Sequence, residues 1–294
     1  MRVLVTGANG QLGRCISEVV VKSREFSHIR LYPHSRSQLD VTDKSQIYSV
    51  LNEIRPQVII NTAAYTDVEG AELNSELAFN INANGAFNLA VAACKIGARL
   101  IHVSTDYVFN GIYGQPLDEL NPVDPINTYG RSKLLGEKLV RATCSNSLVV
   151  RSSGIYSKYG CNFVHKILHK LLNNEVMNVV ADQWVSPCYG NDLAYALLNI
   201  AGNNVVEPGV YHYGGSQVIN WHAFAFMVAN EAYAHNRMVH MINIQAVSSA
   251  YYSGYAPRPS FSALDSSLLN SMGIASYKPA ERLKGLIAFI FKNT

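Results

Sequence analysis

Three side chains near the middle of the sequence have the types and spacing needed to protonate a carbonyl oxygen. Tyr129 and Lys133 stand four residues apart in a segment that continues as a helical pattern, so both are expected on one helix face. An ammonium beside a phenol stabilises the phenolate and lowers the phenol pKa toward the range of a working proton donor. Thr105 follows an apolar run that predicts a buried strand, and its hydroxyl could bind the same oxygen. The pattern predicts a catalytic group of Tyr129, Lys133 and Thr105, with a chance surface pair as the alternative.

The N-terminal segment has the parts of a dinucleotide-binding unit. An apolar run over residues 2–6 predicts a strand, Gly7, Gly10 and Gly13 follow it, and a helical pattern starts near Gln11. Glycines permit a tight turn and a close approach of the backbone to a pyrophosphate, which binds at the helix N-terminus. We therefore predict that Gly7 and Gly10 contact a dinucleotide, with a simple strand-to-helix turn as the alternative.

The end of the second predicted strand, residues 29–32, bears on the choice between NADH and NADPH. Sites that prefer NADH usually place a carboxylate there to bind the ribose 2′-hydroxyl. Here the chain has Ser35 and Arg36, and no carboxylate before Asp40. Because a guanidinium suits a 2′-phosphate, we predict NADPH, with NADH still possible and an exposed turn arginine as the alternative for Arg36. Asp40 and Val41 are expected to flank the adenine.

Strands and helices alternate through the first half of the chain. The other elements predicted there are strands at residues 58–61, 99–104 and 148–151 and a long helix at 76–96. Short β-branched runs without hairpin signals indicate an α/β fold with a parallel, doubly wound sheet of the Rossmann type. Ligands bind such sheets at the carboxyl ends of the strands, where Gly7, Ala64 and Thr105 fall.

The sequence changes in character after Arg151, where loops rich in aromatic residues and proline become common. Such loops suit a lid over a bulky polar ligand. We predict a dinucleotide-binding domain at residues 1–153, with 181–203 packing back on it, and a smaller substrate-binding region at 154–294. Arg258, in a tyrosine- and proline-rich loop, is the predicted substrate contact from this lid.

Composition excludes several classes of function. Hydrophobic residues make up 48% of the chain and charged residues 15%, and the net charge of +3 is scattered, so we expect neither a nucleic-acid partner nor a membrane surface. The five cysteines lie far apart without ligand spacing, which predicts reduced thiols in a cytoplasmic protein. The chain opens directly on a strand and has no apolar run of about 18 residues, so we expect no signal peptide and no membrane span.

The motifs together resemble the dTDP-4-dehydrorhamnose reductase family of the extended short-chain dehydrogenase/reductase superfamily. The resemblance covers nearly the full chain and depends most on STDYVFNG at residues 104–111 and DQWVSP at 182–187. It implies an NADPH-dependent reduction of the 4-keto group of a dTDP-4-dehydro-6-deoxy-L-sugar, in particular dTDP-4-dehydrorhamnose to dTDP-L-rhamnose.

The resemblance also implies roles for single residues. Tyr129 would protonate the sugar carbonyl while nicotinamide delivers hydride, and Lys133 would hold the nicotinamide ribose. Thr105 would assist at the same oxygen, and Asp106 would lie against the sugar. The cofactor contacts that the resemblance implies are Gly10, Gln11, Leu12, Asp40, Val41, Ala64, Tyr65 and Thr66.

The sequence departs from the family pattern in two places. Where the family often has a tryptophan packed on the sugar, this chain has Gly154, which could enlarge the pocket or change the sugar accepted. Trp184 could supply replacement bulk. The first helix starts Arg14-Cys15-Ile16, without the carboxylates by which some members hold a metal at a dimer interface. We therefore predict no metal requirement and either a monomer or a homodimer.

Three alternatives to this function stay open. Reduction from the other face would give dTDP-6-deoxy-L-talose with the same catalytic residues. A dehydratase or epimerase is disfavoured because Asp106 is followed by Tyr107 and not by a second carboxylate. A non-catalytic NADP-binding regulatory subunit would not need the three catalytic side chains that are present.

Overall fold

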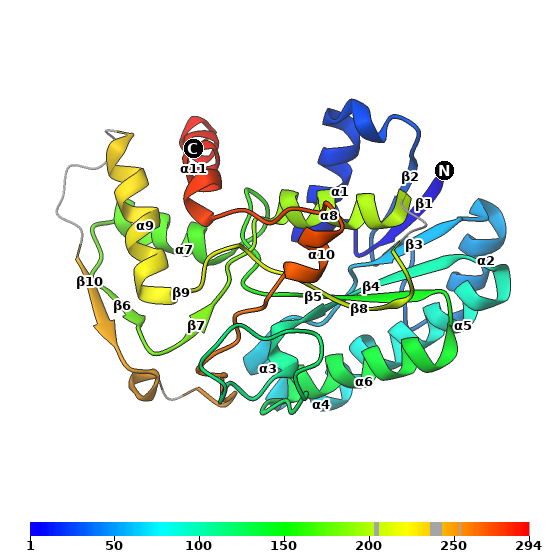
Figure 1. Ribbon diagram of the computed structural model, residues 1–294, viewed down its shortest axis with the longest axis horizontal. Helices are drawn as coiled ribbons and strands as arrows, with labels where there is room; N and C mark the ends of the chain where they lie inside the picture. Colours follow the sequence, from blue (N-terminus) through cyan, green and yellow to red (C-terminus); the bar gives the residue numbers. More distant parts are fainter. Residues whose placement is uncertain (203–205, 236–242, 253, 294) are drawn as a thin grey trace.

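Six parallel strands form the central sheet of the protein (Figure 1), in the order β2-β1-β3-β4-β5-β8. This computed structural model describes residues 1–202, 206–235, 243–252 and 254–293. The strands of the sheet are β1 Arg2–Thr6, β2 Arg30–His34, β3 Val58–Asn61, β4 Arg99–Thr105, β5 Ser147–Ser152 and β8 Gly209–Tyr213. The predicted doubly wound parallel sheet is confirmed. Because the strand order reverses between β1 and β3, the carboxyl ends of these two strands form the crevice where ligands bind such sheets.

Helices cover both faces of the sheet, since alternate residues of a strand point to opposite sides. The helices are α1 Gln11–Lys22, α2 Lys44–Ile54, α3 Val68–Leu73, α4 Ser75–Phe79, α5 Ala86–Ile96, α6 Thr128–Thr143, α7 Phe163–Leu172, α8 Gly190–Gly202, α9 Trp221–Ala234, α10 Ser267–Ser271 and α11 Pro279–Lys292, with the short turns η1 Arg24–Phe26, η2 Asn80–Gly85, η3 Asp106–Val108 and η4 Ser249–Tyr251. Val3 and Val5 pack with α1 and α8 on one face. Leu4 packs with α2 and α5 on the other.

The long helix predicted at residues 76–96 contains a π-helical turn. It is observed as α4, the π turn η2 and α5 in direct succession. Within the turn, the buried Asn82 accepts a hydrogen bond from the Tyr65 N–H at 2.8 Å and donates to the Tyr65 carbonyl at 3.0 Å and to Ser132 at 2.9 Å. The extra residue of a π turn re-aims side chains, and here it ties the loop after β3 to α6.

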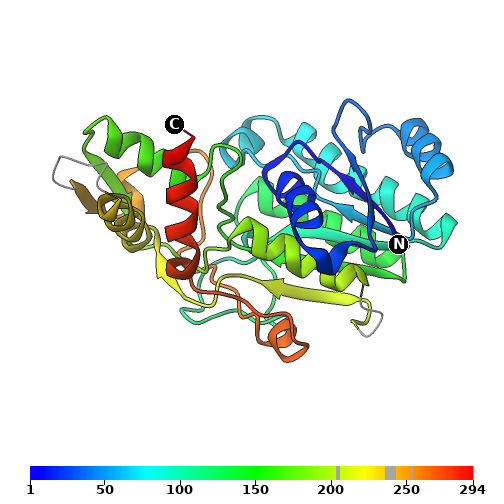
Figure 2. The same cartoon turned by 90° about the horizontal axis from the view of Figure 1, so that it is seen from above.

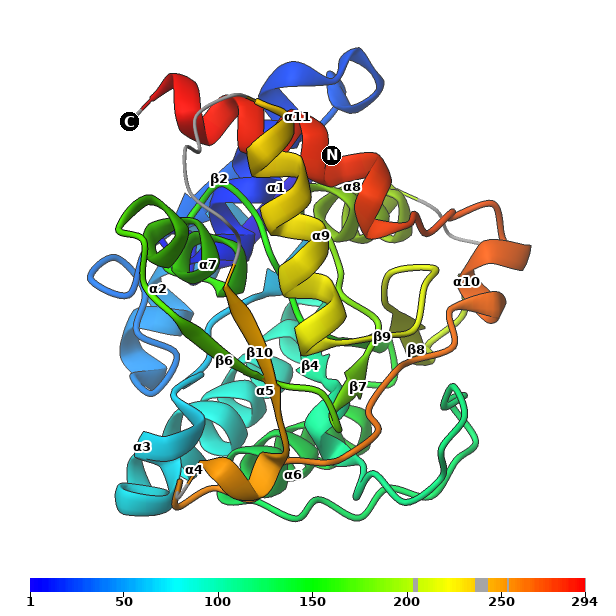
Figure 3. The same ribbon diagram turned by 90° about the vertical axis from the view of Figure 1, so that its left-hand side faces the viewer.

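The chain after β5 builds a second part beside the sheet, at the left of Figure 1 and facing the viewer in Figure 3. Its strands are β6 Met177–Val180, which pairs with β10 Ile244–Val247, and β7 Trp184–Val185, which pairs with β9 Ile219–Asn220. Side chains of α7, α9 and α11 form its own apolar core. Figure 2 shows this part next to the sheet, while β8 and α8, from the same stretch of sequence, lie with the sheet itself.

The helices are short compared with the thickness of a bilayer. A membrane span needs about 20 consecutive apolar residues, and α6, the longest helix in the described ranges, has 16 residues. Across those ranges, no helix has both the length and the apolar character needed to cross a membrane.

Candidate active site

A cavity of about 620 Å³ lies at the carboxyl ends of β1, β3, β4 and β5. Most residues predicted from the sequence line it: Gly7, Gly10, Gln11, Leu12, Arg36, Asp40, Val41, Ala64, Thr66, Thr105, Asp106, Tyr129, Lys133 and Gly154. The sheet therefore brings the glycine turn and the Tyr-Lys pair, which are far apart in the sequence, to one cavity. Two predicted residues, Tyr65 and Arg258, do not line it.

Tyr65 and Arg258 are held by other contacts. The Tyr65 phenol lies against Gly70 of α3, since a Cβ added to that glycine would be 2.4 Å from the phenol oxygen. Arg258 forms an ion pair with Glu69 at 2.6 Å, and its guanidinium interacts with the phenol of Tyr107, which does line the cavity. The predicted ligand contacts of Tyr65 and Arg258 stay predictions.

The turn between β1 and α1 fits a dinucleotide phosphate. Gly7 has φ +65, and a Cβ there would lie 2.8 Å from the Ala63 backbone. A Cβ on Gly13 would lie 2.5 Å from Ala8 Cα, so glycine is needed at both positions. Gly10 caps α1 without a side-chain hydrogen bond, which leaves the first backbone N–H groups of the helix for an anion.

The end of β2 carries the pair that could recognise an adenosine ribose. Arg36 Nε lies 3.1 Å from Asp40 Oδ2, and the Arg36 side chain is 73% exposed. Thr42 donates to Asp40 Oδ1 through both its backbone N–H and its hydroxyl. Against the effect of burial, these hydrogen bonds and Arg36 hold the pKa of Asp40 below its ordinary value. Asp40 is therefore a fixed carboxylate that orients Arg36, and the guanidinium is free to meet a second anion.

Thr105 and Tyr129 lie together at the inner end of the cavity. The Thr105 hydroxyl donates to Asp106 Oδ1 at 2.9 Å, and Asp106, which is buried, also accepts from Ser153 at 2.9 Å and Ser262 at 2.6 Å. Burial raises the pKa of Tyr129, and a hydrogen bond with Thr105 opposes this shift. The phenol therefore keeps its proton at neutral pH, as a proton donor must before reaction.

The contacts of Lys133 differ from expectation. Its ammonium donates to the Val103 carbonyl at 2.7 Å, and it is not among the groups that shift the pKa of Tyr129. The expected lowering of the phenol pKa by the lysine is thus not seen in this arrangement, where burial dominates. Burial lowers the pKa of Lys133 itself to about 8, although Glu137, one helical turn further on, attracts the charge.

His102 and Asn61, which the sequence analysis did not identify, lie beneath Lys133. The Asn61 side-chain oxygen accepts from the Ala63 backbone N–H at 3.1 Å, and a backbone N–H can only donate. The Asn61 amide nitrogen therefore faces His102 Nδ1, 3.0 Å away, and donates to it. The histidine proton must then be on Nε2, which faces Lys133 Nζ at 3.5 Å. A signal for both was polar residues within otherwise apolar strand runs.

The aromatic group next to Gly154 is Trp221 and not Trp184, so the expectation for Trp184 was wrong. Trp184 is 41% exposed and lies in β7, outside the cavity lining. Trp221, at the start of α9, lines the cavity, and its Cη2 would be 3.2 Å from a Cβ on Gly154. Nothing in the local sequence separated the two tryptophans, because their distances from residue 154 depend on the tertiary fold.

Comparison with known proteins shows the family to which the chain belongs. The family model described as the RmlD substrate binding domain matches residues 1–288. The dTDP-4-dehydrorhamnose reductase of Aggregatibacter actinomycetemcomitans is 35% identical, over 98% of this chain and 99% of that protein. The chain belongs to the dTDP-4-dehydrorhamnose reductase family.

Solved structures of the reductase family have the same fold. A dTDP-4-dehydrorhamnose reductase from Clostridium acetobutylicum matches with a TM-score of 0.91 and 31% identity, covering 99% of this chain and 100% of that one. Another, from Bacillus anthracis in complex with NADP, matches with a TM-score of 0.88 and 35% identity, covering 100% of this chain and 99% of that one.

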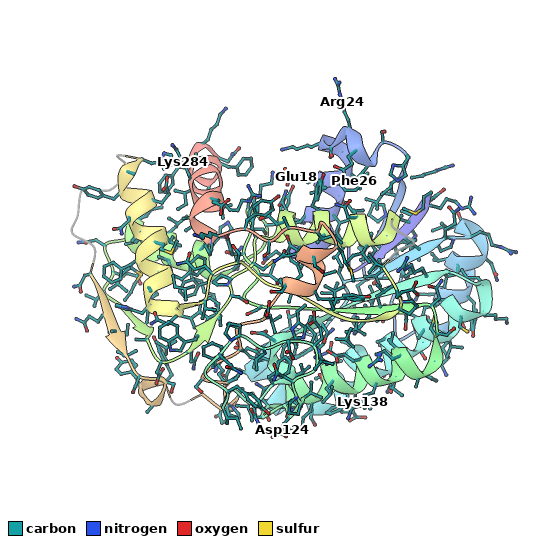
Figure 4. The ribbon with its side chains drawn as sticks, in the orientation of Figure 1. Glu18, Arg24, Phe26, Asp124, Lys138 and Lys284 are labelled. Carbon is teal, nitrogen blue, oxygen red and sulfur yellow. The ribbon has the colours of Figure 1, made fainter. Side chains whose placement is uncertain are left out.

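The first helix of this family member was predicted to hold no metal. Its carboxylate Glu18 contacts Lys22 at 2.7 Å and Lys158 at 2.6 Å and accepts from Asn191 at 3.0 Å; it lies on the side of α1 toward the C-terminal helices (Figure 4). Among the residues described, no group of three or more His, Cys, Asp or Glu side chains is placed to hold a metal ion. The absence of a metal requirement stays a prediction, to be checked with a chelator and added Mg²⁺.

Proposed function

We propose that this protein reduces the 4-keto group of a dTDP-4-dehydro-6-deoxy-L-sugar with NADPH, converting dTDP-4-dehydrorhamnose to dTDP-L-rhamnose. One observation carries the proposal: a single cavity joins the glycine turn at the start of α1 to the Thr105 hydroxyl and the Tyr129 phenol. The family membership and the related reductase in complex with NADP support the choice of substrate and cofactor.

The residues of the glycine turn and of β2 are proposed to hold the cofactor. The N-terminus of α1 would bind the pyrophosphate, Arg36 the 2′-phosphate, and Lys133 the nicotinamide ribose hydroxyls. The remaining proposed cofactor contacts are Gly7, Gly10, Gln11, Leu12, Asp40, Val41, Ala64, Tyr65, Thr66 and Tyr129. When bound, NADPH supplies the hydride that the sugar carbonyl carbon accepts.

Protein side chains manage the proton at the sugar oxygen. Tyr129 gives its proton to this oxygen as negative charge develops there. The Thr105 hydroxyl, turned from Asp106, donates a hydrogen bond to the same oxygen. With the coenzyme bound, Lys133, four residues from Tyr129 on α6, is proposed to stabilise the phenolate that Tyr129 becomes, and Asp106, Gly154 and Arg258 are the proposed sugar-side residues. The phenol then regains a proton from solvent, which balances the reduction.

We also propose how the chain divides and where it works. Residues 1–153, with 181–203, would form the dinucleotide-binding domain and 154–294 the substrate-binding region; the substrate-binding region also contributes β8 to the sheet. All five cysteines are free, which supports a cytoplasmic location. A monomer or homodimer is expected.

The test is NADPH absorbance with dTDP-4-dehydro-6-deoxy-L-mannose generated in situ, followed by NMR of the product sugar. We expect oxidation of NADPH and formation of dTDP-L-rhamnose. The talose epimer as product would keep the chemistry and overturn the assigned face. NADPH binding without any oxidation would instead favour a regulatory subunit.

Tyr129→Phe tests the proton donor within this reaction. Because the variant lacks only the phenol hydroxyl, we expect NADPH affinity to hold and turnover to fall by about 10²–10⁴, the usual contribution of a general acid. Tyr113→Phe, at a tyrosine outside the cavity lining, serves as the matched control. Near-normal turnover of Tyr129→Phe would refute the assigned role.

A further inference from the structure

Beyond Thr105 and Tyr129, the cavity continues to a wall made by the second part of the molecule. Three aromatic residues line the cavity: Tyr107, Tyr129 and Trp221. The two tyrosines stand at the inner end with Thr105, whereas Trp221 comes from α9, outside the sheet. Because one cavity joins Tyr129, the glycine turn and Trp221, a ligand with its carbonyl at Tyr129 and the cofactor at the glycine turn has the indole as a further cavity wall for its remaining ring atoms.

Gly154 is the residue that lets the indole reach this position. Its φ is +52, a conformation that side-chain-bearing residues rarely adopt, and a Cβ there would lie 3.2 Å from Trp221 Cη2 and 3.4 Å from Pro187 Cα. A Cβ at residue 154 would therefore require the indole edge to shift by a few tenths of an ångström, whereas its contact with Pro187 would be an ordinary one. The position of the Trp221 indole therefore depends on the absence of a side chain at residue 154.

Trp221 is also held firmly from behind. Its ring packs on Phe163, with the ring centroids 4.7 Å apart, and is 6.3 Å from Phe224. Asn220 caps α9 by accepting from the Ala223 N–H at 2.8 Å, which fixes the start of the helix. The indole is only partly buried, so one side packs on the core and the rest is presented to the cavity. A rigid, partly exposed aromatic face is a good surface for the C–H groups of a sugar ring.

We propose that Trp221 is the wall against which the deoxysugar ring of the substrate packs, and that Gly154 is the opening through which the indole reaches it. This inference depends on the proposed function, because it names the sugar contact of that same site. Trp221 then determines binding of the sugar and leaves the proton transfer to Tyr129 and Thr105.

The two tryptophans of the chain provide a test that leaves Trp221 in place. In Trp184→Phe, Trp221 is the only tryptophan, and with NADP⁺ bound its fluorescence should change on titration with dTDP-L-rhamnose and change less with dTDP, which lacks the sugar. In Trp221→Phe, the remaining Trp184 should not respond to dTDP-L-rhamnose. Equal responses to dTDP and dTDP-L-rhamnose in Trp184→Phe would overturn the proposal.

Kinetics separate a sugar contact from a purely structural role. Trp221→Ala should raise KM for the nucleotide sugar about tenfold, the size expected for loss of an apolar contact, with KM for NADPH unchanged and kcat within about threefold. Trp221→Phe should recover part of the loss, and Trp184→Ala is the matched control. If Trp221→Ala resembles Trp184→Ala in every constant, the proposal is wrong.

Gly154→Ala tests whether the sugar contact of Trp221 depends on glycine at residue 154. We expect it to raise KM for the nucleotide sugar in the presence of Trp221 and to have a smaller effect in Trp221→Ala, since the added Cβ then meets no indole. Additive effects would contradict the coupling. If the unmodified protein neither oxidises NADPH nor binds dTDP-L-rhamnose, the proposed function fails, whereas normal turnover with a silent Trp221 rejects the sugar wall alone.

Discussion

Two buried cations lie near the site, and they differ in their partners. Arg151 of β5 and Lys133 of α6 are 5% and 2% exposed. Arg151 forms an ion pair with Glu137 at 2.8 Å and a second contact to it through Nε at 3.0 Å. Lys133 has neutral partners, the Val103 carbonyl and the His102 ring, and no ion pair among the described residues. The charge of Arg151 is neutralised within the fold by Glu137, whereas the charge of Lys133 has no ion pair in the described part of the chain.

The histidines beside Arg151 and Lys133 differ in which ring nitrogen carries the proton. His212 Nδ1 is 2.9 Å from the Leu117 carbonyl and must donate to it, so its Nε2 accepts from Arg151 Nη1 at 3.3 Å. His102 has the opposite tautomer, with the protonated Nε2 facing Lys133. The first ring accepts from its cation, whereas the second can donate only to a neutral lysine. The comparison shows that Arg151 is paired with a carboxylate within the fold, whereas Lys133 has no carboxylate partner among the described residues.

The largest expected effect comes from breaking the paired cation. Arg151→Met leaves the Glu137 carboxylate buried without its cation, which should lower the free energy of unfolding by about 3–5 kcal/mol. Denaturant unfolding measures this loss. Arg131→Met, which removes a half-exposed arginine of α6 that lies 3.8 Å from Glu72 of α3, should cost less than about 1 kcal/mol. Equal losses in the two variants would remove the distinction between a structural and a surface pair.

Replacing Lys133, which has no ion pair among the described residues, should raise the free energy of unfolding, whereas replacing Arg151 should lower it. The pKa of Lys133 is about 8 in the folded protein against an ordinary value of 10.5, so between these values the unfolded state binds more protons and wild-type stability rises with pH. Relative to Lys133→Met, the wild type should therefore gain about 2–3 kcal/mol between pH 7 and pH 10, without added coenzyme.

Turnover, in contrast to stability, should fall when Lys133 is replaced. Lys133→Met should lower NADPH oxidation at least about 100-fold and weaken NADPH binding, because the proposed contact with the nicotinamide ribose and the charge one helical turn from Tyr129 are lost. Unfolding curves at several pH values, together with the NADPH assay, check both results. A variant that is less stable than the wild type at pH 7 would show that the charge of Lys133 supports the fold after all.

The parts of this site that the sequence predicted are those that local patterns determine. A glycine turn must follow an apolar strand and open a helix, and a Tyr-Lys pair at helical spacing shares one face, so the sequence could predict Gly7, Tyr129 and Lys133, which line one cavity in the structure. Trp221, Asn61 and His102 were missed because their importance depends on which strands and helices become neighbours. The sequence also could not predict that burial raises the pKa of Tyr129, since burial of this side chain cannot be judged from its neighbours in the sequence.

A smaller effect on stability is expected from replacing His212. Burial, followed by the nearby Arg151, lowers the pKa of His212 to about 3 from 6.5. As the pH falls below 6.5, the unfolded chain takes up a proton that the folded protein does not, so stability is lost in acid. The wild type should lose about 2 kcal/mol more than His212→Asn between pH 7 and pH 5, where asparagine can still donate to Leu117. His28→Asn, at an exposed histidine, is the control, and an identical acid response in both variants would exclude this role.

The smallest effect on stability is expected at an exposed cation. Arg36 is 73% exposed and pairs with Asp40 only through Nε at 3.1 Å, so Arg36→Ala should change the free energy of unfolding by less than about 0.5 kcal/mol. Its affinity for NADPH should nevertheless fall about tenfold, while its affinity for NADH holds, because only NADPH has a 2′-phosphate. Lys44→Ala, at an exposed lysine outside the cavity lining, should leave both affinities unchanged. Equal losses for the two coenzymes in Arg36→Ala would place the 2′-phosphate elsewhere, and a large loss of stability would make Arg36 a structural charge like Arg151.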